Sequence, residues 1–155
     1  MSVDVVTTIE IARSRDDVAS FAADPSNATT WYRNIEAAAW ESSPPLDVGS
    51  RLRFRARFLG RTLEYTYEVA EFVPWERLVM SMTSGPFPME TTYVWTDSAG
   101  GTAMTLRNRG ETKKYFRLLD GVVEASIRRA NRADLARLKV ILEAGSASGP
   151  KETRP

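Results

Sequence analysis

Residues 51–69 read RLRFRARFLGRTLEYTYEV, and polar and apolar side chains alternate through both halves of this stretch. Successive side chains of a strand point to opposite faces of a sheet, so each half predicts a strand with one buried and one solvated face. With Gly60-Arg61 as a two-residue turn, the halves form a hairpin. That register pairs Arg57 with Glu64 and Arg53 with Glu68 outside, and Phe58 with Leu63, Phe54 with Tyr67 and Leu52 with Val69 inside.

The outer face of this hairpin carries Arg51, Arg53, Arg55 and Arg57. Glutamates lie opposite two of these arginines in the predicted register, which is typical of a solvated face with balanced charge. Over the whole chain, 21 basic side chains stand against 20 acidic ones, for a net charge of +1. A nucleic-acid ligand favours a clear excess of positive charge. We therefore predict no nucleic-acid partner.

Further strands are predicted on both sides of the hairpin, at 3–11, 35–42, 77–84, 88–96 and 102–110. Ser14 is expected to begin a first short helix, and Asp24 with Pro25 a second one. The acidic pair 16–17 then lies in the first turn of a helix, which favours a capping role over a catalytic carboxylate pair. A long helix is expected to follow Thr112 and to end near Ala144.

The long helix carries an apolar stripe of Phe116, Leu119, Val123, Ile127, Ala130, Leu138 and Ile141. Gly121 interrupts it, where a kink or a close approach is expected, and Gly145 is expected as the residue just beyond its end. Asp134 projects onto the centre of the stripe at 100° per residue. Either Asp134 is a buried carboxylate paired with an arginine, or the stripe drifts toward Leu135 and Leu142 and leaves it at the margin. The second interpretation is favoured because carboxylates are rarely buried.

These elements predict one α+β domain over residues 1–144, followed by a disordered tail at 145–155 that is rich in Gly and Ser. The domain is expected to contain a strongly curved seven-stranded antiparallel sheet, two short helices and one long C-terminal helix. A twisted sheet wrapped around a single helix leaves space between them. We therefore expect an internal cavity enclosed by the sheet and the long helix.

Short motifs along the chain carry a resemblance to a known superfamily: DP at 24–25, WY at 31–32, PLDVGS at 45–50, FLGR at 58–61, YTYEV at 65–69, PWER at 74–77 and GGT at 100–102. In this order and spacing, over about residues 3–143, the chain resembles the helix-grip fold of the SRPBCC (START/Bet v 1-like) superfamily and its polyketide cyclase/dehydrase-like bacterial branch. The resemblance implies a pocket for a hydrophobic small molecule or lipid. It does not imply catalysis, because a fold does not decide a function.

The composition excludes several kinds of site. The chain has no Cys and no His, so it has no disulfide, no thiolate nucleophile, no Ser-His-Asp triad and no imidazole ligand for a metal. We predict no metal and no cofactor. The longest purely apolar run covers only residues 37–40, so we expect no signal peptide and no stable membrane insertion, and a cytoplasmic location.

The predicted ligand-binding residues are aromatic and methionine side chains with one inward amide. They are Phe54, Phe58, Tyr65, Tyr67, Met80, Met82, Met89, Tyr93, Trp95 and Asn108 on the strands, Trp31, Tyr32 and Phe87 near the mouth, and Phe116, Leu119 and Val123 on the long helix. Alternation places Glu90 and Arg107 on the outer face. The alternative is that these residues fill a solid core without any ligand.

Three functions are consistent with the sequence. The first is binding, with transport or sequestration, of a hydrophobic small molecule or lipid. The second is an aromatase/cyclase or dehydratase acting on a polyketide-like substrate, in which Tyr65 or Tyr67 would donate a proton and Asn108 would orient the substrate. The third is a protein-interaction or co-chaperone-like module, for which the acidic first third and the basic terminal helix are the support. A homodimer is compatible with each.

Overall fold

The computed structural model describes residues 2–58, 60–84, 88–111 and 120–148. Within them lie the strands β1 (Ser2–Ile11), β2 (Ile35–Trp40), β3 (Arg51–Phe58), β4 (Arg61–Val73), β5 (Arg77–Ser84), β6 (Met89–Ser98) and β7 (Gly101–Glu111). The helices are α1 (Arg15–Ala23), the short 3-10 turn η1 (Pro25–Asn27), α2 (Ala28–Trp31) and α3 (Asp120–Ser148). The strands form one seven-stranded antiparallel sheet in the order β1-β7-β6-β5-β4-β3-β2.

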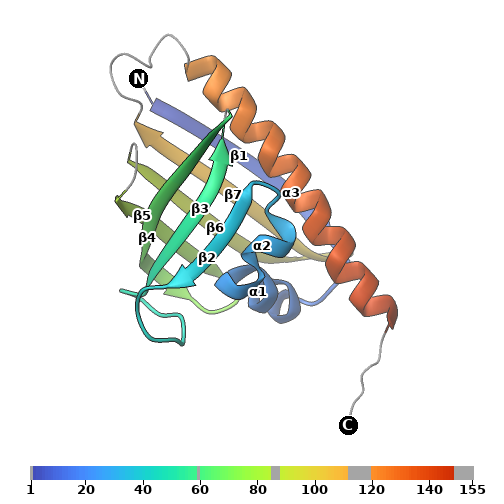
Figure 1. Cartoon of the computed structure of the whole chain (residues 1–155). Helices are drawn as coiled ribbons and strands as arrows, with labels where there is room; N and C mark the ends of the chain where they lie inside the picture. Colours follow the sequence, from blue (N-terminus) through green and yellow to red (C-terminus); the bar gives the residue numbers. More distant parts are fainter. Residues whose placement is uncertain (1, 59, 85–87, 112–119, 149–155) are drawn as a thin grey trace.

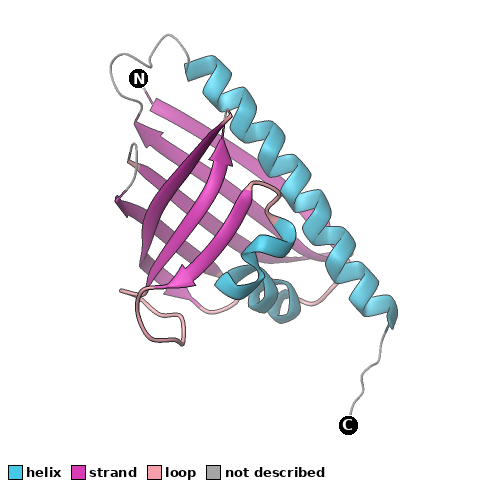
Figure 2. Cartoon of the chain, in the orientation of Figure 1, coloured by secondary structure: helices cyan, strands magenta, loops and turns pink. Residues whose placement is uncertain are grey.

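The sheet curves around one long helix. Figure 1 shows α3 along the open side of the sheet, next to β1, with α1 and α2 at one end. Figure 2 shows the same division into one curved sheet and a small number of helices. The predicted α+β helix-grip architecture is therefore confirmed. No helix in the described part of the chain combines the length and the apolarity needed to cross a bilayer.

The β3–β4 hairpin keeps its predicted faces but not its predicted register. Phe58 pairs with Arg61, Arg55 with Glu64 and Arg51 with Glu68. The prediction with Gly60-Arg61 as the turn is wrong, because the turn lies one residue earlier and Gly60 supplies its positive φ of 78°. Each partner moves by two residues, and an even shift leaves every side chain on the same face.

The outer face of this hairpin is balanced by ion pairs from three strands and the residue after β2. The nearest N–O distances are 2.6 Å for Arg53–Glu64, 3.4 Å for Arg55–Glu36, 3.7 Å for Arg51–Glu68 and 3.8 Å for Arg51–Glu41. Arg51, Arg53 and Arg55 are thus paired with glutamates, although the predicted pairs were different. The predicted Arg57–Glu64 pair is wrong, because Glu64 pairs with Arg53. Solvent-exposed pairs of this kind each contribute only about 0–1 kcal/mol.

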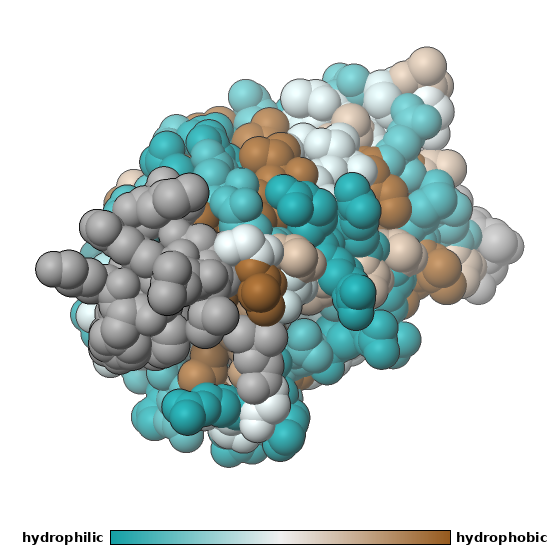
Figure 3. All heavy atoms as spheres, turned by 90° about the horizontal axis from the view of Figure 1, so that it is seen from above, coloured by the Kyte–Doolittle hydropathy of each residue, from teal (hydrophilic) through white to brown (hydrophobic). Residues whose placement is uncertain are grey.

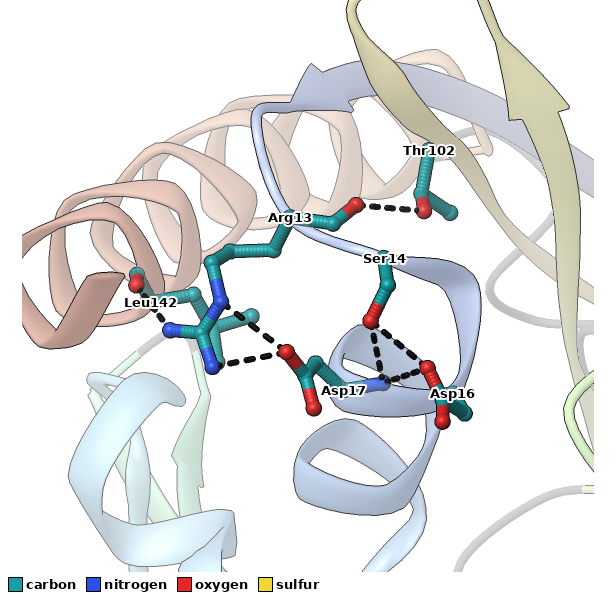
Figure 4. A network of polar contacts seen from close by, with 6 residues as sticks. All are labelled: Arg13, Ser14, Asp16, Asp17, Thr102 and Leu142. Atoms are coloured by element: carbon teal, nitrogen blue, oxygen red, sulfur yellow. Dashed lines mark hydrogen bonds and ion pairs between the residues drawn. The ribbon is translucent and has the colours of Figure 1, made fainter. Parts of the chain in front are cut away.

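A polar network ties the start of α1 to the other end of the chain (Figure 4). Ser14 Oγ accepts from the Asp17 backbone N–H at 3.4 Å and donates to Asp16 at 2.6 Å, which confirms the helix-capping interpretation. The Arg13 guanidinium donates to Asp17 at 2.9 Å and to the Leu142 carbonyl of α3 at 2.6 Å. The end of β1, the start of α1 and the last third of α3 are therefore held together.

The long helix differs from its prediction at several points. It continues through Gly145 to Ser148, so Gly145 is not the residue beyond its end. Gly121 is exposed and a Cβ there would meet nothing within 4 Å, so the expected close approach is absent. Thr112, Phe116 and Leu119 lie outside the described residues. The side chains that α3 buries include Val123, Ile127, Leu135, Leu138 and Leu142.

Most large apolar side chains of the described residues are gathered inside the sheet. One core cluster runs from Ile11 and α1 across the sheet to Leu142, and a smaller one joins Val3 and Val5 to Val123 and Ile127. Seen from above, the visible described surface is mainly hydrophilic, with hydrophobic residues in small separate groups (Figure 3). The interior is therefore the part of the protein suited to an apolar ligand.

Candidate functional site

A cavity of about 180 Å³ lies between the inner face of the sheet, the η1–α2 segment and α3. Alternation explains most of its lining, because every second residue of β3 to β7 points inward. Arg57, which was predicted on the outer face, is an exception and also borders the cavity. Of the predicted ligand-binding residues, those that line it are Tyr32, Phe54, Phe58, Tyr65, Tyr67, Met80, Met82, Met89, Tyr93 and Asn108. Their contact with a ligand stays a prediction.

The other predicted residues lie elsewhere. Trp31 is fully buried behind the cavity wall, with its ring 4.0 Å from Tyr32 and 6.0 Å from Tyr93. Trp95 shares the inner face with Tyr93, but it lies at the end of β6 that α1 covers, and it borders a separate hollow. Val123 packs against Val3 and Val5 and does not line the cavity. Phe87, Phe116 and Leu119 lie outside the described residues.

A chain of hydrogen bonds joins the sheet to α3 along one wall of the cavity. The Tyr67 hydroxyl lies 2.7 Å from Thr91 Oγ1, Asn108 Nδ2 donates to Thr91 Oγ1 at 2.8 Å, and Asn131 Nδ2 donates to Asn108 Oδ1 at 2.7 Å. Burial raises the pKa of Tyr67 to about 12, so its hydroxyl stays protonated. Asn108 points inward as predicted, but both ends of its amide are already engaged.

Sequence reasoning missed Thr91 and Asn131 in this chain of bonds. Thr91 lies between Met89 and Tyr93 on the inner face, so alternation alone would have found it. Asn131 lies one helical turn after Ile127 on the stripe of α3, and its polarity concealed it. The outer-face predictions are correct: Glu90 pairs with Arg109 at 3.0 Å and Arg107 with Asp4 at 2.6 Å.

A second cluster of polar side chains lies where α3 meets the segment after α2. The Tyr32 and Tyr93 hydroxyls are 2.5 Å apart, and burial raises the pKa of both above the ordinary tyrosine value. Asp134 Oδ1 accepts the backbone N–H of Arg33 at 3.0 Å. Both tyrosines are close enough to Asp134 for its charge to raise their pKa further.

Asp134 corrects the sequence interpretation. It is 3% exposed and lines the cavity, so the favoured position at the margin of the stripe is wrong. Its hydrogen-bond partner is also not an arginine side chain but a backbone N–H. Desolvation raises the pKa of the Asp134 carboxyl from 3.8 to about 6, and the backbone N–H and the charge of Arg33 oppose this only in part. The segment after α2 brings a backbone donor to the buried Asp134, which no helical periodicity reveals.

Asp134 lies between the cavity and a second hollow at the surface. Asn34, Ala130 and Asp134 border both the cavity and a surface hollow between α3 and the segment after α2. Arg33 and Arg129, both exposed, lie at that hollow. Among the described residues, no three carboxylates lie close enough together to hold a metal ion.

Comparison with known proteins gives a family and a fold. The family model described as polyketide cyclase / dehydrase and lipid transport matches residues 2–143. Among curated proteins, no sequence matches the chain. Several solved structures share its architecture at low sequence identity, which shows the fold alone.

Three of these structures illustrate the range. The Zhui aromatase/cyclase from Streptomyces sp. R1128 is 15% identical with a TM-score of 0.79, covering 97% of this chain and 100% of its own. A START superfamily protein from Mycobacterium smegmatis is 15% identical with a TM-score of 0.78, covering 91% and 97%. The protein TTHA0849 from Thermus thermophilus is 18% identical with a TM-score of 0.76, covering 93% and 98%.

Proposed function

The chain belongs to the polyketide cyclase / dehydrase and lipid transport family of the START/Bet v 1-like superfamily, and we propose that it binds a hydrophobic small molecule or lipid between the sheet and α3. The observation that carries this proposal is the cavity of about 180 Å³ with its aromatic and methionine lining. A solid core would be packed without such a void. Tyrosine and methionine suit a ligand that is mainly apolar and irregular in shape.

Filling the cavity is expected to weaken ligand binding. Ala130 lies on α3 and lines the cavity, so Ala130→Phe places a ring where the ligand would lie. We expect at least about a tenfold loss of affinity for the uncharged probe N-phenyl-1-naphthylamine, equivalent to about 1.4 kcal/mol. Fluorescence titration measures it, and native mass spectrometry of gently purified protein identifies any compound that copurifies.

Ala136→Phe is the matched control, because Ala136 is exposed on the same helix and does not line the cavity. It should bind the probe as the wild type does. Equal binding by the wild type and Ala130→Phe would place the probe outside the cavity. The absence of both probe binding and a copurified compound would contradict the binding function.

Asp134 supports a second candidate function, the aromatase/cyclase or dehydratase. The tyrosines first considered as proton donors have raised pKa values, whereas the Asp134 carboxyl has a pKa of about 6 and can exchange a proton near neutral pH. In a polyketone, its carboxylate would take a proton from the carbon between two carbonyls, and a tyrosine hydroxyl would donate a hydrogen bond to the resulting enolate.

Turnover of a linear polyketone, followed by chromatography and mass spectrometry, tests this reaction. We expect Asp134→Asn to lower the rate by at least about 100-fold, the usual scale of one acid–base group. Unchanged turnover in this variant would exclude Asp134 as the proton-transfer group. The interaction module, the homodimer and the cytoplasmic location stay predictions from the sequence.

A further inference from the structure

Asp134 presents a buried carboxylate to an apolar cavity. Its Oδ1 accepts the Arg33 N–H, and this is the one hydrogen bond that the described residues make to the carboxylate. The other carboxylate lining the cavity in this part of the chain, Asp24, is exposed and accepts the Ser26 N–H at the start of η1. A buried carboxylate with a single hydrogen bond is costly unless something supplies a further donor or a positive charge.

The surroundings of Asp134 compensate its charge only in part, because the Arg33 N–H and guanidinium lower the pKa of this carboxyl by less than burial raises it. Tyr32 and Tyr93 are hydrogen-bonded to each other, and no hydrogen bond joins either to Asp134 in the described structure. The nearby guanidinium groups, those of Arg33 and Arg129, belong to exposed residues at the outer hollow. Water screens charges there more strongly than in the cavity. The donor side chains of Asn34 and Arg57 also line the cavity, but neither forms a hydrogen bond with Asp134 in the described structure, which leaves a second donor to be supplied by a ligand.

We propose that the cavity takes an apolar compound carrying a protonated amine, which donates a hydrogen bond to Asp134 Oδ2. This inference rests on the proposed binding function and names the class of ligand. The apolar body would lie against Phe54, Tyr65 and Met80, and the tyrosine rings beside Asp134 would offer electron-rich faces to the cation. A carboxylate ligand would be repelled from the same position by the Asp134 charge.

A series of ligands with one skeleton and different polar groups tests the proposal. The four are 2-naphthylmethylamine, 2-naphthylmethanol, 2-ethylnaphthalene and 2-naphthoate, each competing with N-phenyl-1-naphthylamine at pH 7.5. For the wild type we expect the amine to bind at least about tenfold more tightly than 2-ethylnaphthalene, because the ammonium can donate a charge-assisted hydrogen bond to Asp134 and 2-ethylnaphthalene can donate none. The alcohol should lie between them.

Asp134→Asn is the decisive variant, because an amide keeps an oxygen for the Arg33 N–H while removing the charge. In it the advantage of the amine should fall to about threefold or less. Glu90→Gln is the control: it removes a carboxylate from the outer face of β6, away from the cavity. It should leave the order of affinities unchanged.

The outcomes separate this inference from the function on which it rests. Suppose that the probe binds but the amine binds the wild type no more tightly than 2-ethylnaphthalene does, or that the amine binds Asp134→Asn with the same advantage as the wild type. In either case the amine proposal is wrong and hydrophobic binding stands. If 2-naphthoate binds most tightly, the arginines at the hollow select the ligand and the proposal is also wrong. If neither the probe nor any of the four compounds binds, the binding function fails and the amine proposal with it.

Discussion

Asp134→Asn is expected to stabilise the folded protein by about 2–3 kcal/mol at pH 7.5. The pKa of this carboxyl is about 6 in the folded protein against a reference value of 3.8, and each pKa unit corresponds to 1.36 kcal/mol. Holding the carboxylate charged in the cavity therefore costs free energy, which an uncharged amide avoids. The Asn oxygen can still accept the Arg33 N–H.

The raised pKa of Asp134 also determines how the stability difference between Asp134→Asn and the wild type depends on pH. Between about pH 4 and pH 6, folded Asp134 holds a proton that the unfolded chain has released, so this group's contribution to stability falls as the pH rises through that window. The gain in Asp134→Asn should therefore be largest above about pH 7 and vanish below about pH 4. Urea unfolding of both proteins at pH 4, 5, 6 and 7.5 measures it, since shared carboxylates cancel in the difference.

Glu90→Gln serves as the control, because this glutamate is in a solvent-exposed ion pair and should change stability by no more than about 0.5 kcal/mol. A destabilised Asp134→Asn protein at pH 7.5 would mean that Asp134 is a structural residue. Stabilisation together with lost affinity or turnover would mark Asp134 as a group retained for function at a cost in stability.

Gly101→Ala is expected to destabilise the protein by about 3 kcal/mol or more, the range of an exceptional single substitution. Gly101 has φ 143°, which side chains rarely adopt, and an added Cβ would lie 2.3 Å from the Ile11 carbonyl oxygen and 2.9 Å from the Arg13 nitrogen. Both are backbone atoms, so no side-chain rotation can relieve the clash. Relief would have to separate β7 from the end of β1, where Thr102 also donates to the Arg13 carbonyl.

The neighbouring Gly100→Ala is the matched control. Its Cβ would meet only the Glu10 side chain, at 3.2 Å, and that carboxylate can move. We expect a change of about 1 kcal/mol or less, within the ordinary range for a surface position. Similar losses of stability in the two variants, measured by urea unfolding, would mean that contact with the β1 backbone is not the cause.

The strand faces could be predicted from the sequence because alternation is a local property. Phe54, Tyr67, Tyr93 and Asn108 point inward as alternation requires, and Glu90 and Arg107 point outward. The hairpin register could not be predicted as reliably. A shift by two residues conserves both faces, and the position of the turn, with Gly60 at positive φ, selects between the two registers.

Alternation alone could not predict which of the inward side chains line the cavity. Trp95 has the inward phase but lies under α1, whereas Tyr93, two residues away, lines the cavity. Which part of an apolar face is covered by a helix depends on where that helix packs, and this position is set by contacts far apart in the chain. The hydrogen bonds from Tyr67 to Asn131 likewise connect three strands and α3.

The pattern of the arginine-alternating hairpin and its neighbouring segments was enough to establish a curved antiparallel sheet with one apolar face and a long covering helix. Periodicity records which side of an element meets water, and that information is present in each segment alone. The environment of Asp134, by contrast, cannot be predicted from any single segment. Its burial and its raised pKa arise because the segment after α2 meets α3 across 101 positions of sequence. Desolvation by such distant neighbours exists only in the folded protein, and it makes Asp134 the residue on which the proposed ligand and reaction depend.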